Sequence, residues 1–260
     1  MKKKEVIDHI VAWLKDYSDK SNTSGFVVGI SGGIDSALTS TLCAKTGKQV
    51  ICLNMPILQQ KAEYDRGHEH IGWLKKQYGN VSSHEVELTQ TFQAMEQTFP
   101  AGIRDWLTMA NTRARLRMTT LYAFACHHKM LVAGTGNKVE DFGIGFFTKY
   151  GDGGVDLSPI AGLMKSEVFM LAQELGIVDS IRAAKPTDGL FSDGRSDEDQ
   201  IGATYDELEW AMTFLENRQD TSQLSGRQKT VLEIYTRMHK ANQHKMNPIP
   251  VCEIPKELKS

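Results

Sequence analysis

Short apolar segments that alternate with longer amphipathic ones are the feature that most constrains the fold of this chain. Runs typical of strands are predicted at residues 26–30, 49–54, 83–88 and 130–133. Apolar residues at helical spacing predict helices at residues 6–14, 37–45, 61–78, 108–128, 165–175, 204–217 and 226–242. Strands that alternate with helices form βαβ units and a parallel sheet, so the sequence predicts an α/β fold. No repeat or change of composition divides the chain, and residues 1–260 are therefore predicted to be one domain.

Two stretches lack any regular period and are predicted to be long loops. Residues 141–156 are rich in glycine and aromatic side chains, and residues 183–199 are rich in Asp, Gly, Ser and Pro. Long loops inside compact domains often carry function. Both stretches are therefore candidates for a part of the site.

Composition excludes several classes of protein. Lys and Arg number 30 and Asp and Glu 32, a net charge of −2, which argues against binding nucleic acid or an anionic membrane through overall charge. The four cysteines form no CxxC pair, which argues against a structural zinc site and favours reduced thiols. No apolar run approaches the roughly 18 residues of a membrane span. Acidic residues directly follow Met1–Lys4, which argues against a signal peptide. We therefore expect a cytoplasmic protein.

The strongest local signal is Gly29-Ile30-Ser31-Gly32-Gly33-Ile34-Asp35-Ser36, between a predicted strand and a predicted helix. Adjacent glycines let a ligand approach the backbone, and the N–H groups at a helix N-terminus attract phosphate. A carboxylate such as that of Asp35 belongs beside phosphate only if a divalent cation lies between them. The alternative is a glycine turn whose Ser and Asp cap the helix. Neither a GxxxxGK[ST] nor a GxGxxG motif is present.

The SGGxDS pattern of Ser31–Ser36 resembles the pyrophosphate loop of the N-type ATP pyrophosphatases, which cleave ATP between the α- and β-phosphates. Further stretches are similar to the NAD synthetase family in particular: Asn111–Met118, Gly134–Glu140, Gly145–Leu157, Lys185–Thr187, Asp197-Glu198 and His244-Lys245. The chain is short for the glutaminase domain that the glutamine-using branch carries. The resemblance is therefore to the ammonia-dependent branch.

This resemblance implies a fold, a reaction and a set of partners. The fold is a three-layer sandwich of the adenine nucleotide alpha hydrolase type, with a central parallel sheet flanked by helices. ATP adenylates the nicotinate carboxylate of deamido-NAD, pyrophosphate leaves, and ammonia attacks the acyl-adenylate to give NAD and AMP. This is the last step of NAD biosynthesis. The family uses Mg²⁺ and forms homodimers, and it implies no nucleic-acid or membrane partner.

The resemblance also implies roles for single residues. The expected ATP-binding residues are Gly29, Ile30, Ser31, Gly32, Gly33, Ile34, Asp35, Ser36, Thr135, Lys165 and Thr187. The expected deamido-NAD-binding residues are Arg115, Lys149, Asp156, His244 and Lys245. Asp35 and Glu140 are expected to hold Mg²⁺, and Asp152 and Lys165 are the expected catalytic residues, Asp152 by steering or deprotonating ammonium. Lys165 also opens a predicted helix, where the dipole disfavours a cation unless it points at phosphate.

Two alternatives stay open from the residues alone. One is another ATP pyrophosphatase that adenylates a GMP precursor or a tRNA base. A tRNA enzyme would carry a basic face and often paired cysteines, and a GMP synthetase lacks the GFFTKYGDGG run of residues 145–154. The other is a non-catalytic ATP sensor, which would not need Asp35, Glu140 and Lys165 together.

This chain also departs from the common family form near Glu140. Gly136-Asn137 stands where many members have Asp-His, and one additional residue separates Glu140 from Asp152. After Thr187 the chain has Asp188-Gly189 instead of a small residue. We therefore expect the local backbone path to differ at both places.

Overall fold

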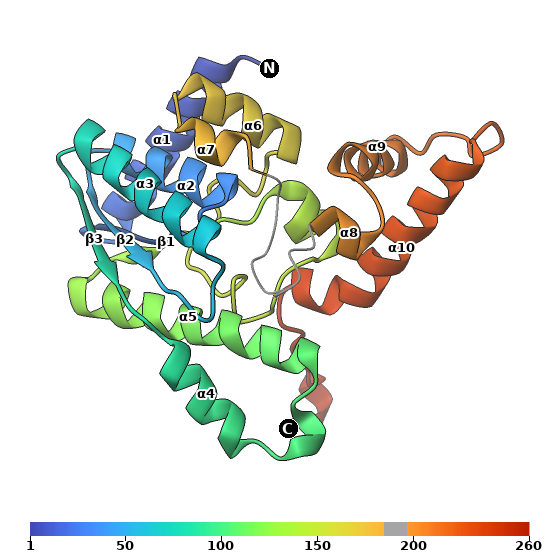
Figure 1. The fold of residues 1–260 in the computed structure, drawn as a ribbon. Helices are drawn as coiled ribbons and strands as arrows, with labels where there is room; N and C mark the ends of the chain where they lie inside the picture. Colours follow the sequence, from blue (N-terminus) through green and yellow to red (C-terminus); the bar gives the residue numbers. More distant parts are fainter. Residues whose placement is uncertain (185–196, 260) are drawn as a thin grey trace.

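Within residues 1–184 and 197–259, which the computed structural model describes, four strands form one parallel sheet (Figure 1). The strands are β1 (Gly25–Gly29), β2 (Gln49–Asn54), β3 (Val81–Glu85) and β4 (Leu131–Val132), in the order β3-β2-β1-β4. Val27 of β1 lies opposite Ile51 of β2 on one side and Val132 of β4 on the other. The carboxyl ends of β1 and β4 are therefore neighbours, and this is the edge from which ligand-binding loops of α/β proteins leave.

The strand side chains alternate between two hydrophobic clusters, one on each face of the sheet. Phe26 and Val28 belong to one cluster and Val27 to the other, and all three are fully buried. The first cluster includes residues of α1 (Lys3–Lys20), α2 (Ile34–Lys45), α3 (Lys61–Gln77), α6 (Lys165–Glu174) and α7 (Asp179–Arg182). The second includes residues of α4 (Thr89–Thr98) and α5 (Trp106–His128), which lies below the sheet in Figure 1. Helices on both faces confirm the predicted three-layer α/β sandwich.

A third hydrophobic cluster lies beside the sheet and joins the C-terminal helices to the middle of the chain. It contains residues of η2 (Val139–Ile144), α8 (Asp197–Ile201), α9 (Tyr205–Glu216) and α10 (Gly226–Met246). Thr204 and Ser225 begin α9 and α10 with capping boxes. In each, the capping side chain accepts from the backbone N–H three residues later, and the side chain of that later residue accepts from the backbone N–H of the cap. These caps start both helices where the sequence predicts them.

The sequence misplaced or missed several elements. Strand β3, predicted at 83–88, lies at Val81–Glu85, because β2 pairs with it from Val81 onward. Val86 and Leu88 then pack in the second cluster instead of continuing the strand. Helix α4 was not predicted, and Phe92 is its one buried residue. The short helix α8 begins inside the stretch 183–199 that was predicted to be irregular. The 3₁₀ turns η1 (Ala101–Ile103) and η3 (Lys256–Leu258) complete the described elements.

The stretch 141–156 also proved less irregular than predicted, because η2 at its start is a π-helix. A π-turn holds about one residue more than an α-turn, and Glu140 lies within this one. Helix α10 satisfies the carbonyl groups at its end: His239 Nδ1 donates to Gly143 O at 2.6 Å and Asn242 Nδ2 to Ile144 O at 2.8 Å. No helix in the described ranges is long and apolar enough to cross a membrane.

Candidate active site

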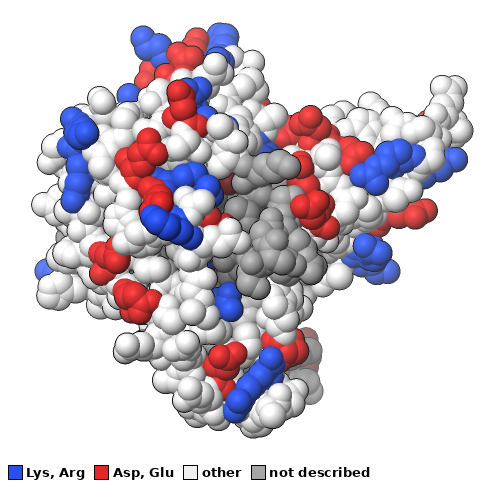
Figure 2. Space-filling view, viewed as in Figure 1, with Lys and Arg blue, Asp and Glu red and all other residues white. Residues whose placement is uncertain are grey.

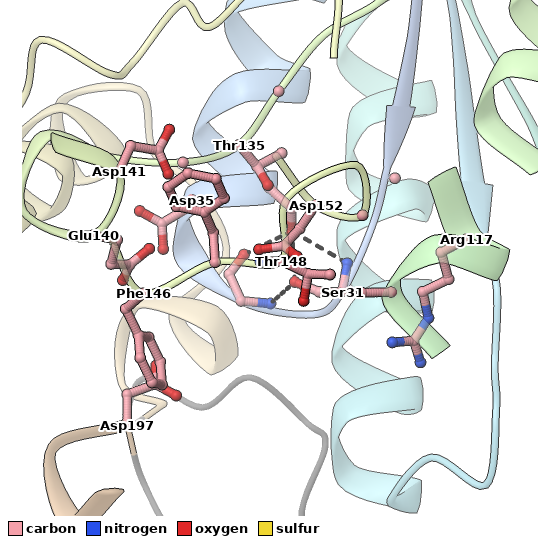
Figure 3. Close-up of a pocket in the computed structure, with 18 of the residues that line it drawn as sticks. Ser31, Asp35, Arg117, Thr135, Glu140, Asp141, Phe146, Thr148, Asp152 and Asp197 are labelled. Atoms are coloured by element: carbon pink, nitrogen blue, oxygen red, sulfur yellow. Dashed lines mark hydrogen bonds between the residues drawn. The ribbon is translucent and has the colours of Figure 1, made fainter. Parts of the chain in front are cut away.

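A cavity of about 590 Å³ opens at the carboxyl ends of β1 and β4 (Figure 3). Its walls come from the loop after β1, the segment after β4, the helices α3, α5, α6 and α10, and residues 145–152. A volume of this size suits a nucleotide-sized ligand. Most of the residues that the sequence singled out converge here.

The loop Gly29–Ser36 forms one wall of this cavity and ends at the N-terminus of α2. Ser36 Oγ donates to Gly33 O at 3.0 Å and accepts from Ser31 N at 3.3 Å, which closes the loop into a tight turn. Gly32 has φ +84° and faces away from the cavity, toward α3, whereas the other seven residues line the cavity. Free N–H groups at the start of α2 and the helix dipole make this wall suitable for phosphate.

Three charged side chains from three different elements meet beside this loop. Lys165 Nζ, at the start of α6, lies 2.6 Å from Asp35 Oδ2 and 3.0 Å from Glu140 Oε1. Lys165 is only 3% exposed. Burial by itself would lower the pKa of Lys165, but the charges of Asp35 and Glu140 outweigh it and hold the pKa above its usual value. The ammonium group is therefore charged at neutral pH and holds both carboxylates.

Two further residues fix this arrangement and were not identified from the sequence. Tyr205 OH donates to Glu140 Oε1 at 2.5 Å, and its ring lies 4.6 Å from Lys165 Nζ. Asn137 Nδ2 donates to Asp35 Oδ1 at 3.2 Å, while its Oδ1 accepts from the backbone N–H of Glu140. Asn137 lies in the segment directly after β4, which is a usable signal, but nothing in the sequence marks Tyr205.

The pair Asp35 and Glu140 has the donor chemistry of a magnesium site. Both offer carboxylate oxygens, and both already share one cationic nitrogen in the structure. Within the described ranges, no three His, Cys, Asp or Glu side chains converge as metal ligands. Mg²⁺ is commonly held by one or two carboxylates together with water and substrate phosphates, so two residues beside a phosphate loop fit this ion.

Two more carboxylates face the cavity from the segment after Glu140. Burial, together with the charges of Glu140, Asp152 and Asp35, raises the pKa of Asp141 to about 8. Asp152 Oδ1 accepts from Thr148 N at 2.9 Å. The surrounding protein removes water from the Asp152 carboxyl group, and this desolvation raises its pKa above the usual value. Figure 3 shows Asp35, Glu140 and Asp141 on one side of the cavity, Asp152 near the middle and Arg117 on the far side. The cavity therefore gathers several carboxyl groups whose protonated forms are favoured while it is empty, and a bound cation would favour their charged forms.

The expected substrate residues Lys149, His244 and Lys245 lie together although they are far apart in sequence. Lys149 Nζ donates to His244 O at 2.5 Å, and Lys245 Nζ donates to Phe147 O at 2.7 Å. Lys245 lines the cavity, and burial lowers its pKa. These bonds attach the stretch after η2 to the end of α10.

The other expected residues lie in different places. Thr135 lines the cavity, whereas Arg115 and Asp156 do not. Arg115 is exposed and its Nη2 donates to Lys149 O at 3.3 Å. Asp156 accepts from Val132 N at 2.8 Å and from Tyr122 OH at 3.0 Å, which places it at the edge of the sheet. Thr187 lies outside the described residues.

Arg117 is a lining residue that sequence reasoning did not select. It comes from the same helix as Arg115, and its Nε donates to Met55 O at 3.0 Å. Two residues along a helix turn the side chain through about 200°, so only one of the two positions can face the cavity. The spacing shows that Arg115 and Arg117 differ in direction, but only the packing of α5 decides which of them faces inward.

Comparison with known proteins connects this geometry to one family. The profile of the family described as NAD synthase matches residues 6–249. The chain is 38% identical to the NH(3)-dependent NAD(+) synthetase of Mycoplasma genitalium, covering 88% of this chain and 90% of that one. It is 36% identical to the enzyme of the same name from Mesoplasma florum, covering 100% and 99%. The solved structure of an NMN synthetase from Francisella tularensis is 32% identical, with a TM-score of 0.85, covering 98% and 100%.

Proposed function

Because this chain belongs to the NAD synthase family, we propose that it is an ammonia-dependent NAD⁺ synthetase. Its substrates would be ATP, ammonia and deamido-NAD, and its products NAD⁺, AMP and pyrophosphate. The observation that carries this proposal is the cavity at β1 and β4. There the phosphate loop, the Asp35–Lys165–Glu140 cluster and the carboxylate of Asp152 line one space.

The geometry suits the formation of an acyl-adenylate. The nicotinate carboxylate attacks the α-phosphate of ATP, and the bond between the α- and β-phosphates breaks as pyrophosphate leaves. The backbone N–H groups at the start of α2 and the charge of Lys165 would stabilise the negative charge that develops on the leaving group. Ammonia then attacks the acyl carbon, AMP leaves, and one proton must be removed from the nitrogen.

We propose Asp35 and Glu140 as the residues that hold Mg²⁺. When bound, Mg²⁺ would offset the charge of the triphosphate beside the loop. Lys165 keeps the two carboxylates close together, and Tyr205 holds Glu140 by a hydrogen bond. Removing Mg²⁺ with EDTA should weaken ATP binding strongly, which titration calorimetry with and without the metal would measure.

Asp152 is the proposed ammonium-steering residue, and Asp152→Asn tests it. The Asn oxygen can still accept from Thr148 N, so the loop keeps its shape while the negative charge is lost. We expect kcat/KM for ammonium to fall about 10²-fold near neutral pH, as for loss of a general base. The defect should shrink as pH rises, because more of the ammonium is then already deprotonated.

A control variant separates this role from a general effect of charge. Asp220 also accepts a backbone N–H, from Ser222 at 3.0 Å, and is exposed as Asp152 is, but it lies outside the cavity. Asp220→Asn should therefore leave kcat/KM for ammonium unchanged. Unchanged turnover of Asp152→Asn at limiting ammonium would remove Asp152 from the mechanism.

The proposed function itself is tested by a product assay. Enzyme, ATP, Mg²⁺ and deamido-NAD are incubated with ammonium in one tube and with glutamine in another. We expect NAD⁺ and AMP to form in equal amounts with ammonium and no NAD⁺ to form with glutamine. Exchange of labelled pyrophosphate into ATP with a different acid, and no NAD⁺, would keep the adenylation chemistry and overturn the substrate.

A second candidate substrate is the mononucleotide, nicotinate mononucleotide. The similar solved structure from Francisella tularensis is named an NMN synthetase, and it matches nearly the whole chain. Both reactions amidate the same carboxylate, so the same loop and charged cluster would serve either. Comparing kcat/KM for deamido-NAD and nicotinate mononucleotide decides between them, and we expect the dinucleotide to be preferred.

The remaining parts of the proposal concern assembly and location. We propose a homodimer, because Ile103 of η1 and Trp106 and Leu107 at the start of α5 leave large apolar side chains about half exposed. Light scattering that gives the mass of one chain would contradict this. All four cysteines are free, which favours a reducing compartment such as the cytoplasm.

On the face in Figure 2, Lys and Arg are interspersed with Asp and Glu, which disfavours a tRNA substrate. Residues 1–260 would act as one catalytic domain.

A further inference from the structure

Arg66 is a basic side chain of the cavity wall to which no role has been assigned so far. It lies on α3, and its Nε donates to the carbonyl oxygen of Gly32 at 3.2 Å. Helix α3 comes this close because Gly32 has no side chain: a Cβ there would overlap the carbonyl oxygen of Glu63 on α3. Arg66 is therefore attached to the middle of the phosphate loop.

The phosphate loop contains no basic side chain of its own, and a leaving pyrophosphate carries several negative charges. Residues 29–36 include no Lys or Arg, and Asp35 adds a negative charge. The other basic side chains that line the cavity have different contacts. Lys165, proposed above to act on the leaving group, is paired with Asp35 and Glu140, whereas Arg117 contacts Met55 O and Lys245 contacts Phe147 O. Among the residues that the structure describes, Arg66 is the basic side chain bonded to the loop backbone.

The guanidinium of Arg66 retains donors for a ligand. Its bond to Gly32 uses Nε, and no salt bridge joins Arg66 to an acidic side chain in residues 1–184 and 197–259. The two terminal nitrogens carry four N–H donors in a planar arrangement that matches two oxygens of a phosphate. Arg66 is half-buried at the cavity, so such an ion pair is less screened than one at the surface.

We infer that Arg66 binds the β- and γ-phosphates of ATP and the pyrophosphate that leaves. The loop to which it is bonded resembles a pyrophosphate loop, and Arg66 would supply the charge that a GxxxxGK[ST] loop takes from its lysine. The inference rests on the proposed function, since it assumes that ATP occupies this cavity. It adds a ligand-binding residue from α3 to those of the loop.

Binding of truncated ligands tests this assignment. Titration calorimetry would measure ATP, pyrophosphate and AMP, all with Mg²⁺, on the wild type, Arg66→Gln and Arg66→Lys. We expect Arg66→Gln to weaken ATP and pyrophosphate binding about 10- to 100-fold, as for loss of a charged hydrogen bond. AMP, which lacks the β- and γ-phosphates, should bind unchanged. Arg66→Lys should lie between, because it keeps the charge and loses the planar pair of donors.

Arg104→Gln is the matched control. Arg104 Nε also donates to a backbone carbonyl, that of Phe99 at 2.7 Å, but Arg104 does not line the cavity. Its variant removes the same charge and should bind all three ligands as the wild type does. Thermal unfolding of each variant shows whether the fold is intact.

Two results would overturn the assignment. Equal losses for ATP and AMP would mean that Arg66 only supports the loop through Gly32 O, and unchanged ATP and pyrophosphate binding would mean that it contacts neither. Failure of the proposed function looks different. Pyrophosphate binding that depends on Arg66, in an enzyme that makes no NAD⁺, would overturn the amidation and leave Arg66 as a pyrophosphate ligand.

Discussion

Replacing Lys165 by Met is expected to lower kcat for the amidation about 10³-fold, the upper range for loss of one transition-state donor. The Nζ atom holds Asp35 and Glu140 at 2.6 and 3.0 Å, and Met keeps most of the side-chain volume without the charge. The variant therefore loses both the cation beside the leaving group and the group that keeps the two carboxylates together. Single-turnover measurements at saturating ATP would isolate the chemical step.

The same variant should also unfold more easily when empty. Asp35 and Glu140 are less than one-fifth exposed, and removing their shared partner leaves two like charges near each other. Breaking a buried ion pair in this way costs about 3–5 kcal/mol in the free energy of unfolding. Mg²⁺ should recover part of this loss, because it returns positive charge to the two carboxylates. Denaturant unfolding with and without Mg²⁺ measures both effects.

Lys138→Met is the control for this prediction. Lys138 pairs with Glu216 at 2.8 Å, but Glu216 is half exposed, and such surface pairs contribute about 1 kcal/mol or less. Lys138 does not line the cavity, so kcat should stay unchanged. A Lys165→Met enzyme whose kcat matched that of Lys138→Met would contradict the role given to Lys165.

Gly32→Ala is expected to have the second large effect, on both ATP binding and stability. Gly32 has φ +84°, a conformation that costs an L-residue about 1–2 kcal/mol. Its added Cβ would also overlap the Glu63 carbonyl oxygen, which belongs to the backbone of α3 and cannot rotate away. The loop or α3 must move, and we expect ATP affinity to fall at least about tenfold, since the loop N–H groups lose their positions.

Gly47→Ala separates the clash from the backbone strain. Gly47 has a similar φ of +76°, but a Cβ there would meet nothing within 4 Å, and the residue lies outside the cavity. This variant should show only the cost of strain in thermal unfolding and should bind ATP normally. If both variants lost the same stability and bound ATP equally well, the close packing of α3 on the loop would not matter for the site.

The strand β1 and the phosphate loop, which the sequence indicated through adjacent residues, lie where they were predicted. β1 was predictable because its residues are apolar on both faces, and a strand covered by helices on both sides must be so. The loop Gly29–Ser36 was predictable because its glycines and the helix that follows are adjacent in sequence. Asp35 and Glu140 were expected to lie close together, because the resemblance implies that both hold Mg²⁺, and the pairing of β1 with β4 brings the two segments side by side.

Features with weak local signals were mistaken or missed. β3 is one of the two edge strands, and its residues are all half-buried or exposed, so its alternation does not define its bounds. Helix α4 buries only Phe92 and therefore lacks a clear apolar period. The π-helix η2 depends on His239 and Asn242 of α10, about 100 residues away, to satisfy its last carbonyl groups. Local spacing carries no information about such partners.

The sequence by itself determined the α/β class, the order of most elements, the phosphate loop and, through resemblance, the reaction. Each of these depends on residues that are adjacent or periodic along the chain. Only the tertiary structure decided that Lys165 bridges Asp35 and Glu140, that Tyr205 holds Glu140, and that Arg66 is bonded to Gly32. These contacts join residues that lie 25 to 130 positions apart or on separate helices. Their geometry comes from the packing of whole elements, in which each side chain's direction is set by the rotation of its helix.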